Sequence, residues 1–126
     1  MPARPVSFSR LFRYLNRQNR QDVYIVLEKR KNGFINNYGE IPVFINRADG
    51  DPWDVIVPGY PKLVTDKPIK LKKLIGIFTL PDGNHKLIVD VYTPYKKDYS
   101  KLYRDVSIFK KKYENLTKLT GSVIYF

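Results

Sequence analysis

The strongest constraint on the fold of this chain is its succession of short apolar segments, each bounded by turn-forming residues. The segments are rich in β-branched and aromatic side chains, and glycine, proline and asparagine separate them. This pattern is typical of β-strands joined by tight turns, and a meander of such strands predicts a small barrel or sandwich. We expect strands over residues 23–27, 41–45, 53–57, 69–79 and 86–92, with a last one over 122–126.

Breaks in this pattern predict local irregularities. Lys31-Asn32-Gly33 is a turn signal that follows the first strand. Pro42 has no N–H to donate to a neighbouring strand, which favours an edge position for the second strand. Gly76 interrupts the long fourth strand and predicts a bend or bulge there.

One helix is expected in the body of the chain, after a polar, tyrosine-rich link over residues 93–103. Asp105 or Ser107 is placed to cap its start, and Gly121 is placed to close its end in the left-handed conformation. The apolar side chains that recur at helical spacing between these limits are Phe109, Tyr113 and Leu116.

The first 21 residues differ from the rest in charge. They hold five arginines and no acid, which gives a net charge of +5. Residues 22–126 hold 18 basic and 12 acidic side chains, which gives a net charge of +6. We therefore divide the chain into a basic N-terminal arm, 1–21, and a barrel domain, 22–126. In the arm, one helical face is apolar, at Phe8, Leu11, Phe12 and Leu15, with Ser7 or Ser9 placed as N-cap.

Another stripe of the same helix holds the expected partner-binding residues, Arg10, Arg13, Arg17 and Arg20. A short basic amphipathic helix suits a protein partner, an anionic membrane or nucleic acid. The alternative is that its apolar stripe packs on the chain's own body while the arginines stay in solvent. The sequence leaves both open.

Composition sets broad limits on the class of protein. The net charge of +11 over 126 residues favours contact with polyanions. The absence of cysteine excludes disulfides and thiolate metal sites. The longest apolar runs are too short to span a bilayer, and no secretory signal is visible, so we expect no transmembrane segment and a location that is not secreted.

Three carboxylates lie within six residues of one another, in the run DGDPWD at 49–54. Asp49, Asp51 and Asp54 repel one another unless a cation neutralises them, and Mg²⁺ prefers such oxygen ligands. This spacing therefore predicts a metal site. The alternative is that Asp-Gly-Asp-Pro serves only as turn chemistry before a strand.

The same run resembles the signature of soluble family I inorganic pyrophosphatases, in which Asp-x-Asp-Pro-x-Asp precedes an apolar strand. Further matches are Asn37-Tyr38-Gly39, Leu74-Ile75-Gly76 and Tyr113 with Leu116, so the resemblance spans about Val23 to Leu116. It implies a mainly β (α+β) fold, a small five-stranded OB-like closed barrel with a C-terminal helix packed outside. It also implies an enzyme that uses Mg²⁺ to hydrolyse pyrophosphate to phosphate.

The resemblance also implies roles for individual residues. Asp51 corresponds to the catalytic carboxylate that helps to deprotonate the attacking water. Tyr38, Lys86 and Tyr113 correspond to groups that face or bind phosphate. The implied metal ligands are Asp49, Asp51, Asp54, Asp82 and, through its carbonyl, Asn84.

Several family positions are lost. Asn84 stands where the family has a charged metal ligand, and Glu114 stands where it has a phosphate-binding lysine. The lysine and glutamate of the family's first strand have only apolar counterparts here. The segment before Asn37 that supplies an essential arginine and a second tyrosine is largely deleted. Losing a transition-state arginine alone reduces phosphoryl transfer on the order of 10³-fold or more.

Three functional hypotheses follow. The first is a degenerate, non-catalytic pyrophosphatase-like domain that serves as a basic structural or interaction module of a larger assembly, such as a viral particle. Its expected location is then the cytoplasm or a viral particle. The second is an active Mg²⁺-dependent inorganic diphosphatase, with missing groups supplied across an oligomer interface. The third is an OB-like nucleic-acid-binding module that uses Lys70, Lys72, Lys73, Lys96, Lys97, Lys101 and Lys110–Lys112.

Overall fold

The computed structural model describes residues 3–18, 21–28, 37–63 and 67–126. The expected turn at Lys31-Asn32-Gly33, and Arg20 of the arm, lie outside these ranges. In chain order the elements are β1 (Arg4–Val6), α1 (Phe8–Leu15), β2 (Tyr24–Leu27), β3 (Tyr38–Asn46), β4 (Pro52–Ile56), β5 (Ile69–Thr79), β6 (Lys86–Val91), α2 (Tyr99–Thr117) and β7 (Ser122–Tyr125).

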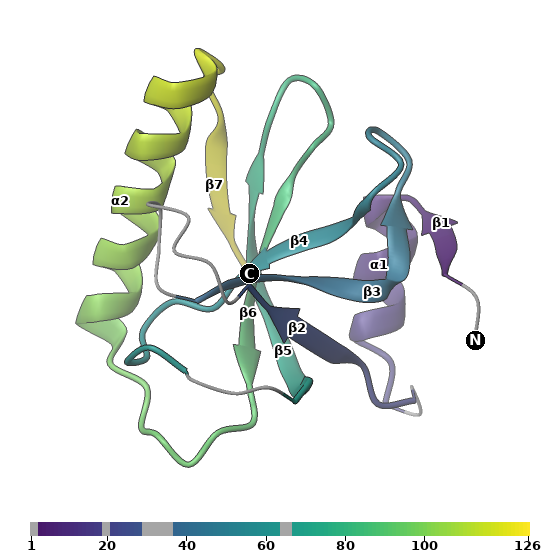
Figure 1. Cartoon of the computed structure of the whole chain (residues 1–126), viewed down its shortest axis with the longest axis vertical. Helices are drawn as coiled ribbons and strands as arrows, with labels where there is room; N and C mark the ends of the chain where they lie inside the picture. Colours follow the sequence, from purple (N-terminus) through teal and green to yellow (C-terminus); the bar gives the residue numbers. More distant parts are fainter. Residues whose placement is uncertain (1–2, 19–20, 29–36, 64–66) are drawn as a thin grey trace.

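Five of the strands close into a barrel. β2 pairs with β5, β5 with β6, β6 with β4, β4 with β3, and β3 returns to β2. Two short strands extend it, because β1 pairs with β3 and β7 with β5. Figure 1 shows α2 and α1 on opposite sides of this barrel. The expected OB-like α+β architecture is confirmed.

Strand alternation gives the barrel an inner and an outer apolar layer. Leu87, Val89 and Val91 of β6 belong to the interior cluster, together with Ile25, Val55 and Leu71. Ile88 points the other way, into a second cluster beneath α2. That cluster holds α2 against the barrel through Leu102, Val106 and Phe109.

The two strand irregularities have different outcomes. The bulge expected at Gly76 is confirmed, since the β5–β6 register shifts between Leu74 and Gly76. A methyl group on Gly76 would lie 2.7 Å from the Ile124 carbonyl oxygen. The edge position expected from Pro42 is wrong, because β3 has neighbours on both sides. Pro42 instead falls where the β3–β4 register shifts, and there its missing N–H breaks no ladder.

The helix ends also correct the sequence-based expectation. α2 starts at Tyr99 rather than after Asp105 or Ser107, and Asp98 is its N-cap, accepting a hydrogen bond from the Lys101 N–H (3.1 Å). Its closing left-handed residue is Lys118 (φ 62°), not Gly121.

The N-terminal helix packs on the chain's own barrel, which was one of the two alternatives. α1 begins after the N-cap Ser7, and its Leu11 and Leu15 are buried in the interior cluster. The strand β1, which nothing in the sequence predicted, precedes α1 in the chain and pairs in parallel with β3. In the described ranges, no helix is long and apolar enough to cross a membrane.

Candidate functional site

The turn between β3 and β4 carries the first two aspartates of the DGDPWD run, and both side chains are exposed. The Asp49 carboxylate accepts a hydrogen bond from the Asp51 N–H (2.9 Å), and Gly50 takes a positive φ of 76° between them. Asn46 closes the turn, because its N–H donates to the Asp51 carbonyl (2.8 Å). These contacts are the ones that Asp-Gly turn chemistry requires.

The turn between β5 and β6 has the same construction and lies directly beside the first. The Asp82 carboxylate accepts from the Asn84 N–H (3.1 Å), and Gly83 has a φ of 81°. The Asn46 side chain donates to the Gly83 carbonyl (3.1 Å), and a methyl on Gly83 would lie 2.9 Å from the Ala48 methyl. The fold thus brings both aspartate-bearing turns to one end of the barrel.

The centre of the site is an ion pair between neighbouring strands. Val55 of β4 pairs with Leu87 of β6, so Asp54 and Lys86 are adjacent on the face that α2 covers. The Lys86 ammonium donates to Asp54 (2.6 Å) and to the Asn84 amide oxygen (3.0 Å). Only 2% of the Lys86 side chain is exposed, and its nitrogen lies 5.3 Å from the centre of the Tyr113 ring.

Two side chains of β3 complete the surroundings of Asp54. Burial raises the pKa of Tyr38 far above its ordinary value, and the Asp54 carboxylate, which accepts its hydrogen bond, raises it further. Glu40 pairs with Asp54 across the β3–β4 ladder, and burial followed by that carboxylate raises the pKa of Glu40. Sequence reasoning missed Glu40. Its signal was the two-residue spacing from Tyr38, which places both on one face.

Tyr113 of α2 faces the two aspartate turns. Burial is the largest cause that raises the pKa of its phenol. The charges of Asp82, Asp54 and Asp49 raise it further, by decreasing amounts. Three of the predicted metal-binding carboxylates therefore act on a single phenol. Lys86, Asn84 and Tyr38 adjoin the same point, so most of the predicted site residues are gathered in one region.

This gathering does not fit a magnesium ion. Within the described part of the chain, no three His, Cys, Asp or Glu side chains are close enough to hold a metal. The charge of Asp54 is neutralised by the Lys86 ammonium, which also takes the carbonyl oxygen of Asn84. Asp49 and Asp82 are engaged by the N–H groups of their own turns.

Glu114 of α2 has a local structural task. One Glu114 oxygen accepts from the Gly121 N–H (2.8 Å), and the other accepts from Lys110 one turn earlier (2.9 Å). The hydrogen bond from Gly121, and then that from Lys110, hold the pKa of Glu114 below its usual value. Glu114 therefore joins the end of α2 to the segment that leads into β7.

The Asn37-Tyr38-Gly39 motif also has structural reasons to exist. The buried Asn37 side chain donates to the Pro61 carbonyl (3.0 Å) and accepts from the Leu63 N–H (2.9 Å), which ties down the segment after β4. A methyl on Gly39 would lie 2.3 Å from the Val26 carbonyl oxygen, where β2 and β3 approach. Two of the three motif residues thus shape the barrel.

The arginines predicted to bind a partner are exposed where the structure describes them. Arg10 and Arg13 lie on α1, and Arg17 follows it, while the apolar stripe of the helix faces the barrel. The expected apolar docking surface is therefore used within the chain, and only the basic stripe faces outward.

His85 is a half-buried structural residue. Its Nδ1 accepts a hydrogen bond from the Leu80 N–H (2.8 Å), and its ring centre lies 6.4 Å from that of Trp53. Burial lowers the pKa of His85, Lys86 lowers it as well, and Asp82 opposes them. The imidazole is therefore held neutral with Nδ1 free of a proton.

We expect acid to weaken the fold through this histidine. Because the folded pKa of His85 lies below the unfolded value of about 6.5, its contribution is complete above that pH and is lost as pH falls through the folded pKa. Urea unfolding followed by the fluorescence of Trp53, the single tryptophan, measures this between about pH 5 and pH 8. His85→Gln removes the only histidine and should flatten that dependence. A wild-type profile that is already flat below pH 6.5 would contradict the assignment.

No protein-family model matches this chain, and no curated protein matches it.

Proposed function

We propose that the chain is a non-catalytic, pyrophosphatase-like barrel that serves as a basic interaction module of a larger assembly. The observation that carries this proposal is the Lys86 ammonium, bonded between Asp54 and Asn84 where catalysis would need a metal ion and a phosphate. The closed barrel and the clustering of Tyr38, Asp54, Lys86 and Tyr113 support the family relationship. The lysine at their centre supports the loss of chemistry.

Hydrolysis of pyrophosphate has three requirements that this site does not supply. The spreading charge on phosphate must be neutralised, the leaving group must be positioned, and a water must be deprotonated. Lys86 is committed to Asp54 and Asn84, so it is not directed at an outer anion. Asp51, the predicted base, is an exposed turn residue, and Glu114, at the position of the expected phosphate-binding lysine, bonds to Gly121 and Lys110 instead.

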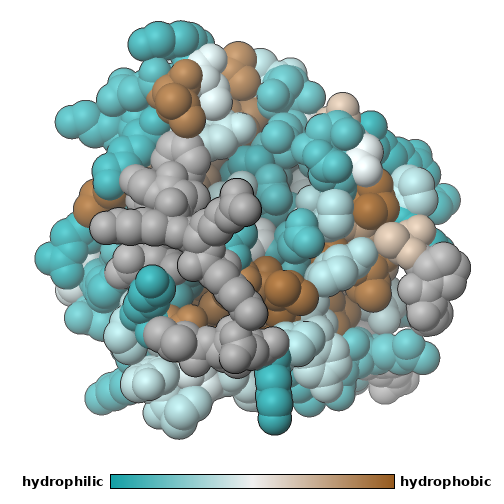
Figure 2. Space-filling model, in the orientation of Figure 1, coloured by the Kyte–Doolittle hydropathy of each residue, from teal (hydrophilic) through white to brown (hydrophobic). Residues whose placement is uncertain are grey.

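The remaining surface supports binding rather than chemistry. The net charge is +11, and the α1 arginines face outward. The face of the molecule in Figure 2 is largely hydrophilic, with its apolar side chains in separate patches. A surface of this kind attracts polyanions and recognises them through complementary charge.

A pyrophosphate assay tests this proposal. We expect no Mg²⁺-dependent phosphate release above the buffer rate, and no difference between the wild type and Asp51→Asn. Millimolar Mg²⁺ should also leave the midpoint of thermal unfolding of the wild type unchanged, because binding to the folded state alone would raise it. Turnover at ordinary enzyme rates of about 1–10³ s⁻¹, abolished by Asp51→Asn, would show instead that the chain is an active diphosphatase.

A further inference from the structure

A basic groove of about 500 Å³ lies between the end of α1 and the first half of β5, away from the aspartate turns. One carboxylate, Asp22, and the ring of Tyr92 contribute to its walls. Four cationic side chains line it, namely Arg17, Lys70, Lys72 and Lys73. A concave surface with this excess of positive charge concentrates anions from solution.

A β-bulge gives the groove two of its cations. Leu71 pairs with Val91 and Lys73 with Asp90, so β5 holds one residue more than β6 between these pairs. As a result the consecutive residues Lys72 and Lys73 are both exposed, where regular alternation would turn one of them inward. The backbone therefore builds a cationic edge at this point.

Exposed aromatic rings adjoin these cations. The Lys70 and Lys72 nitrogens lie 5.1 and 5.8 Å from the centre of the Tyr92 ring, and residue Tyr92 is 54% exposed. Beyond Tyr92 the groove continues into a hollow of about 360 Å³, lined among others by Lys62 and by the exposed Tyr95. Cationic and aromatic side chains thus line both hollows, which share Tyr92.

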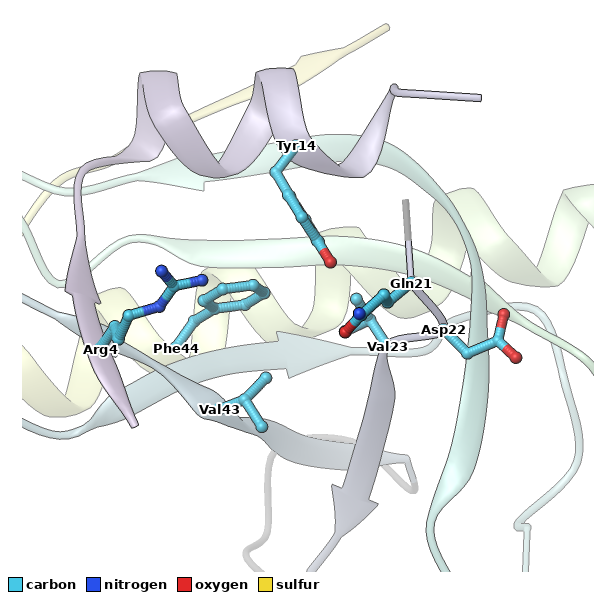
Figure 3. Close-up of a pocket in the computed structure, with 7 residues that line it drawn as sticks. All are labelled: Arg4, Tyr14, Gln21, Asp22, Val23, Val43 and Phe44. Carbon is cyan, nitrogen blue, oxygen red and sulfur yellow. The ribbon is translucent and has the colours of Figure 1, made fainter. Parts of the chain in front are cut away.

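At its other end the groove meets a smaller pocket of about 260 Å³, with Asp22 common to both. Figure 3 shows Tyr14 extending from α1 toward the strands, with Arg4 and Phe44 also lining this pocket. The rings of Tyr14 and Phe44 meet edge to face, with centres 5.4 Å apart. Because Phe44 is buried and Tyr14 is half-buried, this pocket contributes one exposed cation, Arg4, beside the groove.

Three of the six lysines on and just before α2 are held in ion pairs. Lys97 is paired with the buried Asp90, Lys101 with Asp105 (2.7 Å) and Lys110 with Glu114 (2.9 Å). In the groove, Lys70 pairs with Asp22 (3.1 Å), and 40% of the Lys70 side chain and 54% of the Asp22 side chain are exposed. An exposed pair of this kind contributes little and exchanges readily for another anion.

We propose that this groove binds single-stranded nucleic acid. Phosphates lie along Arg17, Lys70, Lys72 and Lys73, and unpaired bases stack on Tyr92 and Tyr95. A positive path beside exposed aromatic rings is the combination that binds single strands with little sequence preference, because every base has a π-face. Rings beside the phosphate path favour this over a double helix, whose bases are stacked inside. This inference shares one element with the proposed function, namely that the chain acts by binding a partner rather than by catalysis.

Fluorescence anisotropy of the full chain with a labelled oligonucleotide of about 16 nucleotides tests this proposal. We expect the affinity to fall steeply with salt, with a logarithmic slope of roughly −2 to −3 for four neutralised phosphates. Lys72→Ala/Lys73→Ala should make that slope shallower by about 1.4. Tyr92→Ala should weaken binding by about tenfold, with the slope little changed.

The matched control is Lys111→Ala/Lys112→Ala, which also changes two consecutive exposed lysines and lowers the net charge from +11 to +9, but on α2. It should keep near-wild-type affinity and slope. Equal losses in the two double variants, an affinity weaker than about 10⁻⁴ M, or equal binding of duplex DNA or polyglutamate would overturn the proposal. None of these outcomes bears on pyrophosphate turnover, so the two proposals fail separately.

Discussion

Replacing Lys86 by methionine is expected to lower the free energy of unfolding by about 3–5 kcal/mol. The substitution keeps most of the side-chain volume but removes the ammonium, so Asp54 is left charged beneath α2 without its partner. Asn84 loses the donor to its amide oxygen as well. Removing one member of a buried pair is costly because the desolvation of the other is no longer offset. Since 23% of the Asp54 side chain is exposed, we expect the loss toward the lower end of this range.

A double-mutant cycle separates the pair from its packing. Asp54→Leu alone strands the buried ammonium and should destabilise strongly too, whereas Lys86→Met/Asp54→Leu should recover most of the loss. Lys70→Met is the matched control, since it breaks the exposed pair with Asp22 and is expected to cost about 1 kcal/mol or less. Urea unfolding measures all four variants. A Lys86→Met protein as stable as the wild type would mean that the ammonium does not hold this site together.

The strand content of the fold was predictable because its signals are local. Alternation of apolar residues, and glycine at positions such as Gly50 and Gly83, marks strands and turns within a few residues. The start of α2 was missed for the opposite reason. Leu102 is its first buried apolar residue and stands among tyrosines and charges, so its role depends on the distant cluster of Ile56, Phe78 and Ile88.

The candidate site shows the same limit. Motif matching identified Asp54, Lys86 and Tyr113 as neighbours of one site, and the fold does bring them together. What they do there depends on the parallel β4–β6 register, which sets Asp54 beside a lysine 32 residues away. No local pattern encodes that register. The strand β1 escaped prediction likewise, because its three residues are defined by their pairing with β3.

Truncating Phe109 to alanine is expected to destabilise the protein by about 3–5 kcal/mol and to loosen α2 from the barrel. The ring is fully buried and contacts three other rings, with centre distances of 6.0 Å to Phe78, 5.7 Å to Tyr113 and 5.8 Å to Tyr38. Its loss leaves a cavity in the cluster that joins the helix to the outer face. Urea unfolding measures the effect, and Ile108→Ala, at a residue that is 43% exposed, should stay within about 0.5 kcal/mol.

This variant also tests whether the outer cluster and the ion pair are coupled. Phe109 contacts Tyr38 and Tyr113, the two phenols that flank Asp54 and Lys86, so loosening α2 should admit water to the pair. In the Phe109→Ala background, Lys86→Met is then expected to cost clearly less than in the wild type, because Asp54, of which 23% is already exposed, is hydrated further. Strictly additive losses would show that the barrel strands alone limit the access of water to the ion pair. In that case α2 would be a cover over the site rather than a part of it.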